Sequence, residues 1–99
     1  INNFVNAVET KKDFVRNPDK IFRHIVSEVG ELDGAMFNFE RHRDMPNGMF
    51  LADGVGRELV DIIFLCCYLA DVYGVDLNGL APERMRQIAK QYDVDWKDE

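Results

Sequence analysis

The sequence predicts an all-α protein in which residues 1–99 form one domain, a four-helix bundle-type subunit. Ninety-nine residues are enough for one hydrophobic core and too few for two domains. The composition is 46% hydrophobic and 30% charged, with seven glycines and three prolines, which argues against disorder and against a turn-rich β architecture. Apolar residues also recur at steps of three, four and seven, as on the buried face of a helix.

The first two predicted helices meet at Pro18. One covers about residues 3–16 and stops there, because the residue before a proline disfavours helical geometry. The next begins at Pro18 or Asp19, a favourable helix start, and extends to about His42. Its apolar residues at helical spacing are Ile21, Ile25, Leu32, Met36 and Phe39.

One long connection is expected over residues 43–56, which hold Pro46, Asn47-Gly48 and Asp53-Gly54. These are helix breakers and turn formers, so the segment is predicted to be a loop.

The third and fourth helices follow this connection. The third is expected over about residues 57–73, and Gly74 then offers the left-handed conformation that closes many helices. The fourth is expected over about residues 78–92, with Pro82 tolerated because amides of the first turn have no intrahelical acceptor.

The third helix is apolar on nearly every side, so it must be buried. Three amphipathic neighbours in one small chain cannot easily cover it, which predicts that a second subunit covers the rest, so that the chain forms a homo-oligomer. Cys66 and Cys67 are adjacent within this apolar run, which suits neither a cross-linking disulfide nor a four-ligand zinc site. We expect two buried thiols in a reducing cytoplasm.

Charge and hydropathy exclude several classes of partner. A formal net charge of -6 disfavours direct contact with DNA or RNA phosphates. The most apolar segment, residues 59–75, contains Asp61 and Asp71 and is shorter than the roughly 20 residues of a bilayer span. No basic region followed by an apolar stretch opens the chain, so we expect a soluble, cytoplasmic protein.

Two pairs of carboxylates carry the chemistry that the sequence predicts. Glu28 and Glu31 are three residues apart on the second helix, and Glu58 and Asp61 are three apart on the third, so each pair lies on one helix face. If the two helices pack antiparallel, the pairs can face each other, and four like charges then need a divalent cation between them. Oxygen ligands without His or Cys at matching spacing favour Mg²⁺, with Mn²⁺ as the alternative.

Two segments carry a resemblance to a known family. Ser27-Glu28-Val29-Gly30-Glu31-Leu32 and Gly56-Arg57-Glu58-Leu59-Val60-Asp61-Ile62-Ile63 resemble the ExxE and ExxD signature of the MazG-like all-α nucleoside triphosphate pyrophosphohydrolases. The segment from Tyr68 to Leu77 is also similar to the end of that family's third helix, and the likeness covers roughly residues 21–92.

The resemblance implies a helical bundle assembled through the apolar helix as a homodimer or a dimer of dimers (homotetramer). It also implies a magnesium-dependent hydrolase that cleaves a nucleoside triphosphate to the monophosphate and pyrophosphate, in the cleaning of nucleotide pools. Carried over by position, Glu28, Glu31, Glu58 and Asp61 hold the metal, and a metal-activated water attacks the α-phosphorus.

The sequence departs from the family pattern at Ser27. Many members have a glutamate immediately before ExxE that can serve as general base, and this chain has a serine there. His24 lies one turn before Glu28 on the same face and is the candidate replacement.

The second departure lies in the fourth helix, where the family commonly has a Lys and an Asn near the substrate. Arg84 falls near the Lys position and Ile88 where the Asn is often found, so Arg84 is the candidate phosphate contact, with Lys90 or Arg86 as substitutes. Further substrate-binding candidates are Asn38, on the stripe of Glu31, the stacking rings Phe37 and Phe39, and Phe4, Lys12 and Arg16 from a neighbouring subunit.

Two alternatives remain open from the sequence. One is a phosphoribosyl-ATP pyrophosphohydrolase, a class of enzyme that shares the fold and the use of paired carboxylates. The other is a non-catalytic oligomer that binds nucleotides or a partner protein, which is consistent with the serine at position 27, Ser27. A di-iron carboxylate bundle is disfavoured, since neither Glu31 nor Glu58 has a histidine three residues on.

Overall fold

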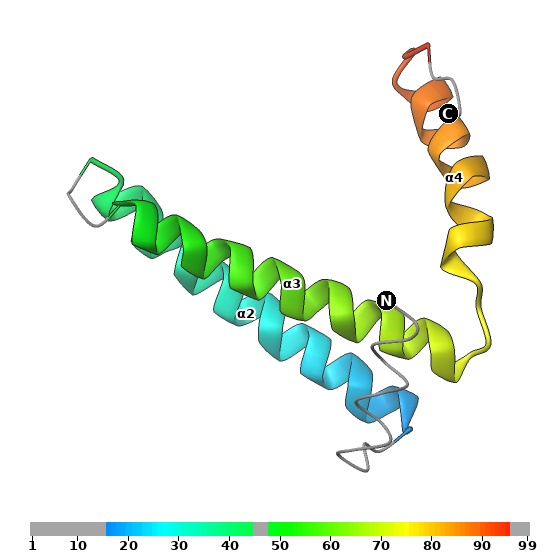
Figure 1. Ribbon diagram of the computed structural model, residues 1–99, viewed down its shortest axis with the longest axis horizontal. Coiled ribbons are helices and arrows are strands. Elements are labelled where there is room, and N and C mark those ends of the chain that lie inside the picture. Colours follow the sequence, from blue (N-terminus) through cyan, green and yellow to red (C-terminus); the bar gives the residue numbers. More distant parts are fainter. Residues whose placement is uncertain (1–15, 45–47, 96–99) are drawn as a thin grey trace.

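The computed structural model of the chain describes residues 16–44 and 48–95 (Figure 1). These residues form three helices, α2 (Pro18–His42), α3 (Gly48–Val72) and α4 (Leu77–Gln91). The described part of the chain contains no strand, which confirms the all-α class. The helix predicted over residues 3–16 lies outside the described residues except for Arg16.

The start of α2 follows from Asn17 and Pro18. The Asn17 side chain accepts hydrogen bonds from the backbone N–H groups of Asp19, at 2.9 Å, and Lys20, at 3.2 Å. These amides have no acceptor within the helix, so the Asn17 side chain stabilises the first turn. Pro18 has no N–H to satisfy, and the helix ends at His42, as the sequence predicts.

The loop predicted over residues 43–56 is wrong in its second half, because α3 already begins at Gly48. Gly54 and Gly56 therefore lie inside a helix, where each costs about 1 kcal/mol relative to alanine. Packing against α2 overrides that weak local preference, and α2 and α3 each reach 25 residues. The connection between them is correspondingly short.

α2 and α3 pack side by side and antiparallel as a helical hairpin (Figure 1). The least exposed positions of α2 recur at steps of three and four from Ile21 to His42, and those of α3 include Glu58, Ile62, Leu65, Tyr68 and Val72. This spacing places one stripe of each helix against the other.

The buried core lies near the start of α2 and the end of α3. It contains Ile21, Cys67 and the fully buried Tyr68, with Ile25, Phe64, Leu69 and Val72 packed around them. The rings of Phe64 and Tyr68 meet edge to face, with centroids 6.1 Å apart. Arg16 Nη1 donates to Asp71 Oδ2 at 2.9 Å, which ties the residues before α2 to the end of α3.

The end of α3 is closed as predicted by Gly74, whose φ is 68°. The Val75 N–H donates to the carbonyl of Ala70 at 2.8 Å and the Gly74 N–H to that of Asp71 at 3.0 Å. These two bonds form a Schellman motif, in which the left-handed residue lets the chain satisfy the last helical carbonyls.

α4 begins one residue earlier than predicted, at Leu77, so Pro82 lies in the second turn and not the first. Its ring removes a helical bond to the carbonyl of Asn78, which the rest of the helix tolerates. α4 projects away from the hairpin and barely contacts it (Figure 1). Bundle packing of α4 is therefore not observed among the described residues.

None of the described helices combines the length and hydropathy that a membrane span requires. α3 packs on α2 along one stripe only, and Leu59, Val60 and Ile63 remain about half exposed. Within one chain α3 is therefore covered on one face, because one neighbouring helix covers one face of a cylinder, and the second subunit expected to cover the rest remains a prediction.

Candidate metal centre

Three of the four predicted carboxylates come together between α2 and α3. Glu28, Glu31 and Glu58 each place one carboxylate oxygen within 4.8 Å of the other two. Glu28 and Glu58 belong to the facing stripes of the hairpin, and Glu31 lies one turn after Glu28 at the edge. The antiparallel packing thus brings together residues that are 30 positions apart in the chain.

Glu28 and Glu58 are partly enclosed by the helices that carry them. The side chain of Glu28 is 12% exposed, and the Oε2 atoms of both residues are shielded from solvent without a hydrogen-bond partner. Two ionised carboxylates are acceptors only, so neither can satisfy the other. A shared proton or a cation is needed to compensate both charges at this position.

The surroundings of Glu58 raise the pKa of its carboxyl group strongly. When Glu58 is protonated it can donate a hydrogen bond to Glu28; this bond of the protonated form, burial, and the negative charges of Glu31 and Glu28 raise the pKa of Glu58 from 4.5 to about 7. Each of these causes makes it less favourable for Glu58 to ionise and add a third negative charge to the cluster. The same causes favour a divalent cation, which neutralises the carboxylates without protonating them.

The donor set fits a hard divalent cation. Opposite oxygen ligands of octahedral Mg²⁺ lie about 4.2 Å apart, twice its metal–oxygen distance, so a set spread over 4.8 Å needs only a small side-chain adjustment. Three carboxylates leave positions for water and for phosphate oxygens, as is usual for Mg²⁺. The residues present therefore fit Mg²⁺ or Mn²⁺.

Asp61 does not join the three glutamates. Three helical positions turn the chain by about 300°, so Asp61 points roughly 60° away from Glu58, and its side chain is one methylene shorter. It lies exposed in a surface depression of about 620 Å³ with Asp53 and Arg57. Asp53 was predicted to lie in a loop, but it lies inside α3, where the spacing by four puts Asp53, Arg57 and Asp61 on one helix face.

His24 lies beside the cluster. Its Nε2 is 3.5 Å from Glu28 Oε1, one turn earlier on α2, while just over half of the His24 side chain is exposed. The ring thus contacts the Glu28 oxygen other than the shielded Oε2. Ser27 is exposed on the same helix, and no described hydrogen bond involves its side chain.

Asn38 is exposed two turns beyond Glu31. Each of the two neighbouring aromatic rings makes a cation–π contact with an arginine. The Arg41 guanidinium lies 5.5 Å from the centre of the Phe37 ring, and the Arg43 guanidinium lies 5.7 Å from the centre of the Phe39 ring. These contacts occupy one face of each ring.

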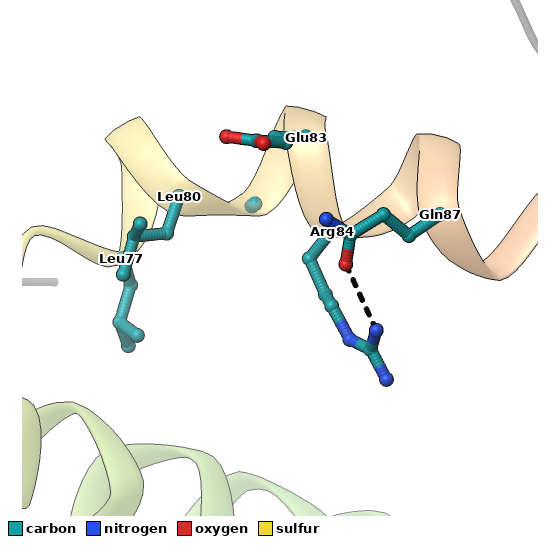
Figure 2. Close-up of a pocket in the computed structure, with 6 residues that line it drawn as sticks. Leu77, Leu80, Glu83, Arg84 and Gln87 are labelled. Carbon is teal, nitrogen blue, oxygen red and sulfur yellow. Dashed lines mark hydrogen bonds between the residues drawn. The ribbon is translucent and has the colours of Figure 1, made fainter.

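Arg84 and Lys90 lie on α4, away from the carboxylates (Figure 1). Figure 2 shows Arg84 extending from α4 and donating through Nη1 to Gln87 Oε1, at 3.0 Å, in a hollow that Leu77 and Leu80 also line. Within one chain these cations do not reach the three glutamates. Phe4 and Lys12 lie outside the described residues.

The prediction of two buried thiols is half wrong. Cys67 is buried in the core, whereas Cys66 is exposed, because adjacent helical positions point about 100° apart.

No family model, curated protein or solved structure matches this chain.

Proposed function

We propose that the chain is a magnesium-dependent nucleoside triphosphate pyrophosphohydrolase of the MazG type that acts on cytoplasmic nucleotide pools. The observation that supports this most is the convergence of Glu28, Glu31 and Glu58, with two shielded carboxylate oxygens that lack partners. A divalent cation satisfies these oxygens and also binds a polyphosphate, which explains how a chain with net charge -6 accepts an anionic substrate.

In this proposal the three glutamates would hold Mg²⁺, and the bound ion would supply an anchor for phosphate oxygens and a more acidic water. Asp61, on the next turn of α3, is the candidate fourth ligand, reached through a water or a side-chain rotation. Glu28 and Glu31 also orient the attacking water. His24, in contact with Glu28, is the candidate acceptor of the water proton in place of the glutamate absent at Ser27.

The decisive measurement is pyrophosphate release from a panel of ribo- and deoxynucleoside triphosphates, with phosphoribosyl-ATP included, in the presence of Mg²⁺. Pyrophosphate together with the nucleoside monophosphate supports the proposal. Glu31→Gln and Glu58→Gln are expected to lower kcat/KM about 100-fold or more, because each removes a charged ligand.

Glu40→Gln is the matched control. Glu40 is exposed on α2 and pairs with Arg43 at 3.2 Å, outside the cluster. It should retain full activity, and circular dichroism should show the same helix content in all variants. Orthophosphate release, or activity that survives both cluster substitutions, would contradict the proposal.

Because Ser27 stands where many members of the family have a glutamate general base, it favours one other function. In this alternative the chain is a helical oligomer that binds a metal–nucleotide complex without efficient turnover. Magnesium-dependent nucleotide binding by calorimetry, with no pyrophosphate released from any member of the panel, would favour this alternative.

A further inference from the structure

Two apolar surfaces of the described structure face solvent. The first, the hairpin face, consists of Phe22, Val26, Val29 and Met36 on α2 with Leu59 and Ile63 on α3, each between 46% and 57% exposed. Each of these six residues comes directly after a residue of the stripe along which α2 and α3 contact each other. Because the helices run antiparallel, residues that follow the stripe on each helix point to the same side of the hairpin.

The second surface, the α4 stripe, consists of Leu77, Ala81, Met85, Ile88 and Tyr92. The steps of three and four put these residues on one side of α4. All five are exposed, and two shallow hollows lie along them, one of about 660 Å³ near Leu77 (Figure 2) and one of about 430 Å³ near Tyr92.

The corner between α3 and α4 keeps these two surfaces of one chain apart. The Schellman bonds fix Gly74 and Val75, and only Asp76 separates them from α4, whose Leu80 N–H donates to the Asp76 carbonyl at 3.1 Å. Folding α4 back onto its own hairpin requires a different backbone conformation at Val75 and Asp76. A second copy can cover the surface with the corner as it is.

The helices that carry the two surfaces differ in the sign of their net charge. α2 and α3 together carry nine carboxylates and four Lys or Arg residues, whereas α4 carries one glutamate and three Lys or Arg residues. Asp33 is the charged residue between Val29 and Met36 on the hairpin face. Arg84 is the charged residue along the α4 stripe, one turn before Ile88.

We propose that two copies exchange their α4 helices, so that the α4 stripe of each packs on the hairpin face of the other, with Asp33 opposite the partner's Arg84. The contact is reciprocal and occurs twice, as two-fold symmetry requires. Six half-exposed side chains on the hairpin face and five on α4 supply an area on the order of the 800 Å² per partner of a stable interface. The inference specifies how the chain self-associates and does not rest on the proposed activity, since His24 and Glu31 lie on the other side of α2.

Light scattering on the full chain tests the assembly. We expect twice the chain mass of 11.5 kDa at micromolar concentration. Met85→Gln with Ile88→Gln should raise the dissociation constant at least tenfold, whereas Glu83→Gln with Lys90→Gln, on the other side of α4 and neutral in net charge, should leave it unchanged. A monomer at 100 μM (about 1 mg/ml for a chain of this size), or equal effects of the two double variants, overturns the proposal.

Mixing distinguishes exchange from the other arrangements. The Met85→Gln/Ile88→Gln chain keeps an intact hairpin face, and a Phe22→Gln/Ile63→Gln chain keeps an intact α4. At a concentration where each is monomeric, the mixture should form dimers, because one of the two contacts is restored. Absence of rescue, with native helix content by circular dichroism, indicates a hairpin-to-hairpin dimer or an α4 folded back within its own chain and overturns the exchange.

The charge pair gives a residue-level test. Asp33→Arg and Arg84→Asp should each weaken dimerisation at least tenfold, and the double variant should recover most of that loss. Additive losses in the double variant overturn the pairing of Asp33 with the partner's Arg84.

Discussion

Glu28 on α2 and Glu58 on α3 face each other across the hairpin, and the Oε2 atoms of both are shielded from solvent without a hydrogen-bond partner. Packing that would normally favour apolar residues instead encloses two acids, with Glu31 close by. Such an arrangement costs folding free energy unless a proton or a cation compensates the charges.

The first prediction concerns pH in the absence of divalent cations. The folded chain keeps the Glu58 proton up to its pKa of about 7, whereas the unfolded chain releases it near 4.5. The folded state therefore binds more protons between these values, so this contribution to stability is present below pH 4.5 and is lost as the pH rises through 7. In EDTA, thermal unfolding of Glu58→Gln should depend less on pH than that of the wild type and exceed its Tm above pH 7. The same pH dependence in both proteins contradicts the shared-proton interpretation.

Added Mg²⁺ or Mn²⁺ should raise the Tm, and more so at pH 8 than at pH 5, because the metal binds ionised carboxylates in the folded state. At a hundred times the dissociation constant the gain is about 2.7 kcal/mol. Glu31→Gln should reduce the Tm gain, whereas Glu40→Gln, outside the cluster, should retain it. An equal gain in both variants would place the cation elsewhere on the molecule.

Removal of the Asn17 side chain, which caps the first turn of α2, should destabilise the hairpin that carries Glu28. Asn17→Ala leaves the N–H groups of Asp19 and Lys20 without their side-chain acceptor and should cost about 1 kcal/mol in the free energy of unfolding by urea. Asn17→Asp keeps the acceptor and should cost far less. Equal losses in the two variants would show that the cap contributes nothing.

The two left-handed residues in the part of the chain that the structure describes, Gly74 and Asp93, should respond in opposite directions to substitution. Gly74→Ala places a Cβ at φ 68° and should destabilise the chain by about 1 kcal/mol, although nothing lies within 4 Å of the added atom. Asp93 has a φ of 58° at the end of α4, so Asp93→Gly should stabilise it by a fraction of that amount. Thermal unfolding monitored by circular dichroism measures both changes. If Gly74→Ala were more stable than the wild type, the idea that a Cβ at this left-handed position strains the backbone would be wrong.

Local sequence signals predicted several features because they act within a few residues. Asn17 and Pro18 begin α2, and Gly74 closes α3 through its own backbone, so neither needs a distant partner. The start of α3 was mispredicted for the complementary reason: Gly54 and Gly56 weaken a helix locally, and only contact with α2 shows that the helix continues through them.

The sequence by itself determined which residues form helices over most of α2 and α4, and which carboxylates share a helix face, because helical periodicity is a property of neighbouring residues. Tertiary structure alone decided that Glu28, Glu31 and Glu58 converge while Asp61 points aside, that Cys66 is exposed, and that α4 stands away from the hairpin. Those outcomes depend on the rotation of each helix about its axis and on the angle at the Gly74 corner, which are set by packing between segments far apart in the chain.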